Sequence, residues 1–160
     1  MTIHTIFSPN LHAAGAHLAA RTLSMLLSKG DFMNFRCEWS ETPRFMNDSW
    51  QITVAEDVVP LNIATNDSGA LIEPCKISMY QAKPIRKIEV FCYTNLPDGE
   101  TEEETVNYDQ AILFSCEDDR AFCIGCSLNG PGVADYLHFS EDPEVIRSIT
   151  EGSSIRQTLN

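Results

Sequence analysis

Short segments in which apolar and polar residues alternate, separated by turn-forming residues, follow one another from Asp31 onwards. This alternation is typical of half-buried strands, whereas a helix repeats its apolar residues roughly every three to four positions. Strands are expected at residues 32–39, 50–55, 58–64, 70–80, 87–94, 110–116, 121–128 and 134–139. Runs of strands joined by turns predict a mainly antiparallel sheet of about six to eight strands.

The segment before Asp31 has a different pattern, which predicts an N-terminal helix over residues 9–29. The hydroxyl group of Ser8 can cap a helix, Pro9 suits the first helical position, and Gly30 is a common residue just after a helix. The apolar residues between these ends have helical spacing: Leu11, Ala14, Leu18 and Met25, joined by Leu23, Leu26 and Leu27.

A second, short helix is expected near the C-terminus. Residues 140–143 can cap it, Val145, Ile146 and Ile149 give it a buried side, and Gly152 ends it. The tail that follows can add an edge strand. The fold class expected for residues 1–160 is therefore α+β, a single globular domain with an N-terminal helix and a short C-terminal helix packed on a mainly antiparallel sheet.

One hairpin is expected in detail. Residues 110–116 and 122–128 should pair through a loop at residues 117–121, with Cys116 opposite Phe122 and Phe114 opposite Ile124. The shared buried face should hold Ile112, Phe114, Phe122 and Ile124. A helix in place of the second strand would instead favour a redox role for Cys123 and Cys126.

Cysteine and histidine chemistry finds little support in the sequence. Cys123 and Cys126 have the spacing of a dithiol motif, but alternation in a strand would point their thiols apart, and one pair is not enough for a zinc site. His12 and His17 lie five positions apart, so they would not share one face of a helix. A Cys/His or His/carboxylate site assembled by the fold remains an open alternative, because such partners need not be close in sequence.

The formal charge of −12 belongs entirely to the second part of the chain. Eight acidic residues balance eight basic ones up to residue 87, whereas fifteen acidic residues face three basic ones in residues 88–160. An acidic surface favours cationic partners and repels nucleic-acid phosphates, and basic patches interleaved with aromatic residues do not occur. No apolar run approaches the roughly 18 residues of a membrane span.

These features predict a small acidic cytoplasmic binding protein, of the immunity type or imitating nucleic acid, that inhibits a basic protein partner such as a nuclease toxin. Direct binding to nucleic acid or membrane, a cofactor, a metal site and catalytic residues are not expected. An enzyme with a site assembled by the fold, or a non-catalytic structural or adaptor subunit, is the alternative. The expected partner-binding residues are acidic: Glu102, Glu103, Glu104, Glu117, Asp118 and Asp119.

Overall fold

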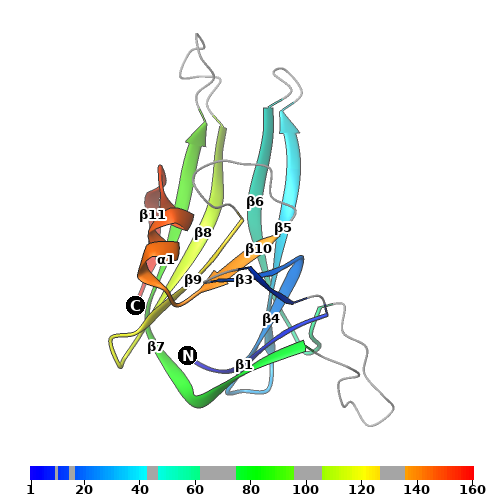
Figure 1. Ribbon diagram of the computed structural model, residues 1–160, viewed down its shortest axis with the longest axis vertical. Helices are drawn as coiled ribbons and strands as arrows, with labels where there is room; N and C mark the ends of the chain where they lie inside the picture. The colour runs from blue at the N-terminus through cyan, green and yellow to red at the C-terminus, as the bar shows by residue number, and fades with distance from the viewer. Residues whose placement is uncertain (10, 15–16, 43–46, 62–74, 96–105, 127–135) are drawn as a thin grey trace.

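The computed structural model describes residues 1–9, 11–14, 17–42, 47–61, 75–95, 106–126 and 136–160. The described residues are mostly strand, with one short helix near the C-terminus, and the described strands all pair in antiparallel fashion. They form one open, 11-stranded sheet in the order β2-β3-β10-β9-β8-β7-β1-β4-β5-β6, with β11 paired to β7 (Figure 1). The strands are β1 (Thr2–Ser8), β2 (His12–Ala14), β3 (His17–Ala20), β4 (Thr22–Leu27), β5 (Phe32–Thr42), β6 (Asn47–Asp57), β7 (Cys75–Asn95), β8 (Val106–Cys116), β9 (Ala121–Gly125), β10 (Leu137–Ser140) and β11 (Ser154–Leu159).

The sheet has two halves, one containing β1, β4, β5 and β6 and the other containing β8, β9 and β10, and the longest strand, β7, belongs to both. Its first part pairs with β1, and its last part pairs with β8 on one edge and with β11 on the other. The pairing with β8 is irregular between Ile85 and Lys87, close to the place where β7 leaves β1. Figure 1 shows β7 bending there, so that β1, β4, β5 and β6 lie across from β8, β9 and β10.

The hydrophobic core fills the space between these two halves. Phe35 of β5 and Phe114 of β8 meet edge to face with ring centroids 6.2 Å apart, and Phe114 stacks on Phe122 at 4.7 Å. Burial of side chains this large is the main favourable contribution to folding. The buried cluster draws on both halves: Ile3, Ile6, Leu23, Met25, Leu27, Phe35 and Ile52 from one, and Ala20, Ile112, Phe114, Cys116, Phe122, Ile124, Cys126, Leu137 and Phe139 from the other.

The short helix α1 (Pro143–Thr150) covers the outer face of β8 and β9. Proline stands in its first turn, and the Asp142 carboxylate accepts hydrogen bonds from the backbone N–H groups of Glu144 and Val145 at 2.8 and 3.2 Å. Ile149 is fully buried against Ala111 and Cys123. The expected C-terminal helix is therefore present, and the tail after it forms the expected edge strand, β11.

The expected α+β fold class with an N-terminal helix is wrong, because the described part of the protein is mainly antiparallel sheet with one short C-terminal helix. The described residues within 9–29 contain no helix and instead form β2, β3 and β4. In β4, residues on both faces are buried, with Leu23 and Ser24 each 1% exposed and Met25 fully buried. A strand buried on both faces shows no alternation, so its apolar run resembles a helical stripe. Gly30, expected to end a helix, instead ends the β4–β5 turn.

The expected hairpin is confirmed, with a shifted register. Strands β8 and β9 pair with Phe114 opposite Phe122 and Ile112 opposite Ile124, rather than with Cys116 opposite Phe122. The shift is two residues on one strand, which keeps every side chain on its expected face. All four side chains of the predicted apolar face are accordingly buried.

The remaining strand predictions differ in outcome. Residues 32–39, 50–55 and 87–94 lie within β5, β6 and β7, and the expected strand at residues 134–139 overlaps β10. Residues 58–61 are not a strand, since the chain bends there after β6. Residues 62–64, 70–74, 127–128 and 134–135 of the predicted strands lie outside the described residues.

Candidate functional site

Three of the six predicted partner-binding residues lie in the turn between β8 and β9. Glu117, Asp118 and Asp119 are exposed there, and the turn is closed by a hydrogen bond from the Cys116 N–H group to the Arg120 carbonyl oxygen at 2.8 Å. We call residues Glu117–Arg120 the acidic turn. The two paired strands fix its position at one end of the sheet.

The backbone of Asp119 is in the left-handed region, with φ at 61°. The β4–β5 turn has the same form: the Leu27 N–H group donates to the Asp31 carbonyl oxygen at 2.9 Å, and Gly30 has φ at 92°. A residue with positive φ is common at this place in a three-residue hairpin loop, where glycine is favoured because it has no Cβ. The acidic turn therefore has an aspartate where the equivalent turn has a glycine.

Two arginines on the same surface neutralise much of the negative charge of the acidic turn. The Arg120 Nε donates to Asp118 Oδ2 at 2.6 Å, and Arg86 Nη1 lies 3.3 Å from Asp119 Oδ1. The hydrogen bond from Arg120 lowers the pKa of Asp118, because it stabilises the ionised carboxylate. Three carboxylates facing two guanidinium groups leave one net negative charge, far less than the run of acidic residues in the sequence suggests.

A pocket of about 450 Å³ adjoins the acidic turn beside α1. Glu141 at its edge forms an ion pair with Lys83, whose side chain is 6% exposed and lies 6.0 Å from the centre of the Phe122 ring. The pocket therefore combines an apolar lining with charged groups at its edge. Its lining comes from both elements: Leu113, Asp119, Arg120, Ala121, Glu141, Pro143 and Ile146.

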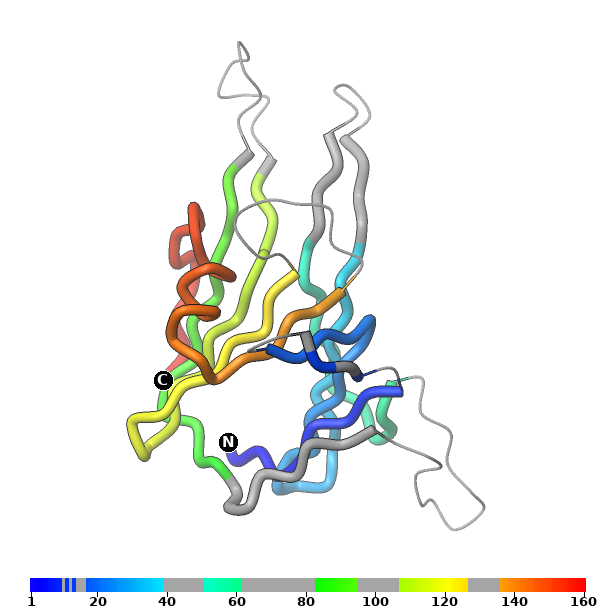
Figure 2. The backbone as a smooth tube through the Cα atoms, in the orientation of Figure 1, coloured from blue at the N-terminus to red at the C-terminus, as the bar shows by residue number. Residues whose placement is uncertain are grey.

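The other three predicted residues, Glu102, Glu103 and Glu104, lie outside the described residues. The strands that flank them, β7 and β8, are described and pair at their ends through Asn95 and Val106. Strand β8 runs from Val106 to Cys116, a span of roughly 30 Å at about 3.4 Å per residue. In sequence, the two acidic segments are therefore attached to opposite ends of β8, whose course Figure 2 shows.

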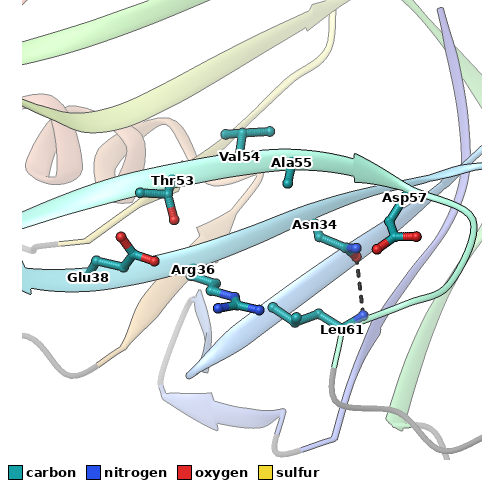
Figure 3. Close-up of a pocket in the computed structure, with 8 residues that line it drawn as sticks. All are labelled: Asn34, Arg36, Glu38, Thr53, Val54, Ala55, Asp57 and Leu61. Carbon is teal, nitrogen blue, oxygen red and sulfur yellow. Dashed lines mark hydrogen bonds between the residues drawn. The ribbon is translucent and has the colours of Figure 1, made fainter.

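A second pocket, of about 280 Å³, lies on the outer face of β5 and β6. Figure 3 shows Arg36 between Glu38 and Leu61. The Leu61 N–H group donates to Ser24 Oγ at 2.9 Å and to Asn34 Oδ1 at 3.2 Å, which holds the chain after β6 against the sheet. Sequence reasoning missed this pocket, since single charges in an alternating strand are normal on a solvated face. Its lining is Asn34, Arg36, Glu38, Thr53, Val54, Ala55, Asp57 and Leu61.

Four buried cysteines are poor nucleophiles. Burial raises the pKa of Cys123 to about 12, and it also raises the pKa values of Cys92, Cys116 and Cys126. A thiol with a raised pKa is rarely ionised near neutral pH, and the thiolate is the reactive form. The two cysteines that have dithiol spacing in the sequence do not lie together: Cys123 packs under α1, whereas Cys126 belongs to the core between the two halves of the sheet.

The pairing of β3 with β10 places two histidines together. The rings of His17 and His138 meet edge to face with centroids 5.0 Å apart, a contact that their distance in sequence concealed. Among the described residues, no three His, Cys, Asp or Glu side chains are grouped so that they could hold a metal ion.

No known family model matches the chain, and neither a curated protein nor a solved structure is detectably similar to it. Within the described part of the chain, none of the helices is both long and apolar enough to cross a membrane.

Proposed function

We propose that the protein is a small acidic binding protein that associates with a basic protein partner, as immunity proteins and inhibitors that imitate nucleic acid do. The observation that carries the proposal is Asp119, a carboxylate at a left-handed turn position where the matching turn has Gly30. A residue in a strained conformation at an exposed turn supports a functional role, because the turn alone would be more stable with glycine.

The surroundings of the acidic turn support recognition through short-range ion pairs. Asp119 is 87% exposed and its contact with Arg86 is long and solvated, so a cationic group of a partner can replace that arginine at small cost. Asp118 is held in place by Arg120 and is therefore oriented before binding. Paired carboxylates that are already oriented lose less conformational entropy on binding.

The proposal favours a binding protein over an enzyme. The raised pKa values of the buried thiols oppose a cysteine nucleophile. A cytoplasmic location is part of the proposal, and it is supported by the five cysteines whose side chains are described, all of which are free thiols.

The test begins with a pull-down from the native host, followed by association and dissociation rates for the recovered partner at several salt concentrations. The acidic-turn variant carries Glu117→Lys, Asp118→Lys and Asp119→Lys. A control with the same change in charge carries Glu38→Lys, Glu56→Lys and Asp57→Lys, at exposed positions of β5 and β6. We expect the acidic-turn variant to bind at least tenfold more weakly while the control keeps most of its affinity.

Two results would count against this proposal. Equal loss in both variants would mean that only the net charge matters, and unchanged binding in the acidic-turn variant would mean that the turn is an ordinary solvated surface.

A further inference from the structure

Two histidines lie together on the outer face of the sheet. The rings of His17 on β3 and His138 on β10 meet edge to face, with centroids 5.0 Å apart and planes at 65°. His138 is opposite Ala19, which lies two residues from His17 on the same face of β3, so the two histidines are diagonal neighbours across the strand pair. Leu137 and Phe139 belong to the main core cluster, so the histidines between and beside them point away from the core and are partly exposed.

The separation of the two rings fits two ligands of one zinc ion. A zinc–nitrogen bond of about 2.0–2.1 Å, with roughly 1.2 Å more from the nitrogen to the ring centre, puts each ring centre about 3.2 Å from the metal. Ring centres 5.0 Å apart then correspond to a nitrogen–zinc–nitrogen angle of roughly 100°, close to the tetrahedral angle of about 109°. The ring nitrogen that does not bind zinc can keep a hydrogen bond to the protein, as is usual for histidine ligands.

Two imidazoles are half of a closed zinc site, which has four ligands. Among the described side chains, no third histidine, cysteine or carboxylate joins the pair to complete the site. A second copy of the chain can supply the missing half, because a two-fold symmetric contact brings the same surface patch of both copies together. Two histidines near the symmetry axis then become four.

The place of the histidine pair in the sheet favours such a contact. Strand β2 ends the described sheet, and β3 and β10 are the next two strands, so the pair lies near an edge. The formal charge of −12 per chain opposes association, but the described strands β2, β3 and β10 contain no acidic residue. Repulsion between two copies is therefore low at this edge, since exposed charges are screened beyond about 8 Å at physiological ionic strength.

We propose that His17 and His138 bind one zinc ion together with the same two residues of a second copy, so that zinc joins two chains into a symmetric dimer. Each imidazole gives a nitrogen lone pair to the metal, and the four nitrogens replace water molecules in the coordination shell of zinc. No bond within the protein forms or breaks. This dimer goes beyond the proposed function and depends neither on the acidic turn nor on its basic partner.

The test measures the mass of the purified full chain by sedimentation velocity, either with zinc chloride at one ion per two chains or with EDTA. We expect a monomer in EDTA, a dimer with zinc, and a return to monomer when EDTA is added to the dimer. A calorimetric titration with zinc should reach saturation at one ion per two chains. Magnesium chloride at the same concentration should leave the chain monomeric, because magnesium prefers oxygen ligands to imidazole.

Single substitutions identify the ligands. His17→Ala and His138→Ala should each lower the association constant of the zinc dimer at least tenfold. Both side chains are partly exposed, and circular dichroism verifies that the variants are folded. Two controls remove other accessible side chains that could bind zinc, the exposed His4 on β1 and the partly exposed Cys37 on β5. His4→Ala and Cys37→Ser should both keep the dimer. The wild-type measurements with zinc and EDTA hold even if a histidine variant folds poorly.

The proposal is overturned if zinc binds at one ion per chain without a change in mass, if the mass is the same in zinc and in EDTA, or if the dimer persists in both histidine variants. It is equally overturned if His4→Ala or Cys37→Ser abolishes the dimer.

Discussion

Exchanging the residues at the left-handed positions of the two matching turns tests whether Asp119 is kept at a cost in stability. A residue other than glycine in the left-handed region costs roughly 1–2 kcal/mol, and somewhat less for aspartate. Replacing a residue by glycine, however, gives the unfolded chain extra freedom worth about 0.4–1 kcal/mol. The contact with Arg86 adds little, because both side chains are more than half exposed. Asp119→Gly should therefore stabilise the protein by about 0.5 kcal/mol.

The reverse substitution, Gly30→Asp, should destabilise the protein by about the same amount or slightly more. A Cβ atom built on Gly30 meets no other atom within 4 Å, so the cost is confined to the backbone conformation. Gly30→Ala is the matched control, since it adds the Cβ atom without a charge.

The measurement is urea unfolding of all three variants, supported by thermal midpoints. For a chain of this size a change of 1 kcal/mol moves the midpoint by about 2–4 °C, so shifts of roughly 1–2 °C in opposite directions are expected. If Asp119→Gly lowers stability by more than about 1 kcal/mol, the turn is not strained and the argument for a functional aspartate fails. If Gly30→Ala raises stability, the backbone argument itself is wrong. The stabilised Asp119→Gly variant should nevertheless bind the partner more weakly.

Further predictions concern the packing and the buried charges. A Cβ atom on Gly125 would clash with Ile149 Cγ2, so Gly125→Ala should lower the free energy of unfolding in urea by about 1–3 kcal/mol. The double variant with Ile149→Ala should lose less stability than the sum of the two single variants. Additive losses would mean that α1 does not press on β9. The folded state keeps the Cys123 proton up to a pKa of about 12 whereas the unfolded state loses it near 9.0, so stability should fall as pH rises above 9, by up to about 1.4 kcal/mol per pH unit for this thiol. Urea midpoints at pH 8 and pH 10 should differ less in Cys123→Ala, and an equal decrease in both proteins would contradict this assignment. Glu141→Gln should lower the free energy of unfolding by about 1–3 kcal/mol, because it leaves the buried Lys83 without a carboxylate partner. Lys83→Met removes the buried charge itself and should lower it by less than about 1 kcal/mol. The opposite ranking of the two variants in thermal unfolding would refute the inference.

The alternation of apolar and polar residues correctly predicted those strands that have one buried face. Strands β8 and β9 alternate clearly, so their shared apolar face was correct. The register was wrong because the predicted loop was too long: the turn closes between Cys116 and Arg120 and has only three residues within it. That short turn needs a positive φ at Asp119; aspartate tolerates this conformation, but the run Glu-Asp-Asp-Arg does not show which residue adopts it.

The failure at the N-terminus has a different cause. Leucine and alanine have high helix propensity, but β4 lies between β1 and β5 and is buried on both faces. Tertiary packing overrides local preference in such a strand, and its continuous apolar run contains no signal that separates it from a buried helix.

The parts of the candidate site that join distant strands were beyond sequence analysis. The contacts of Arg86 with Asp119 and of His17 with His138 both depend on which strands become neighbours. Residue types and their spacing do not reveal the order of the strands in the sheet, because β7 pairs with strands from both ends of the chain.

The acidic residues before and after β8 in the sequence differ in how their charge can act in the proposed function. Along the chain, the two acidic segments are attached to opposite ends of β8, and only the acidic turn lies within the described residues. The acidic turn itself has a net charge of only −1 once Arg86 and Arg120 are counted, so its own field at long range is weak. In the proposed function, long-range attraction is assigned to the segment between β7 and β8, because its sequence has no basic residue between Asn95 and Val106. The acidic turn is suited to short-range contact instead. Its oriented carboxylates can hold a bound partner, so it should determine the dissociation rate more than the association rate.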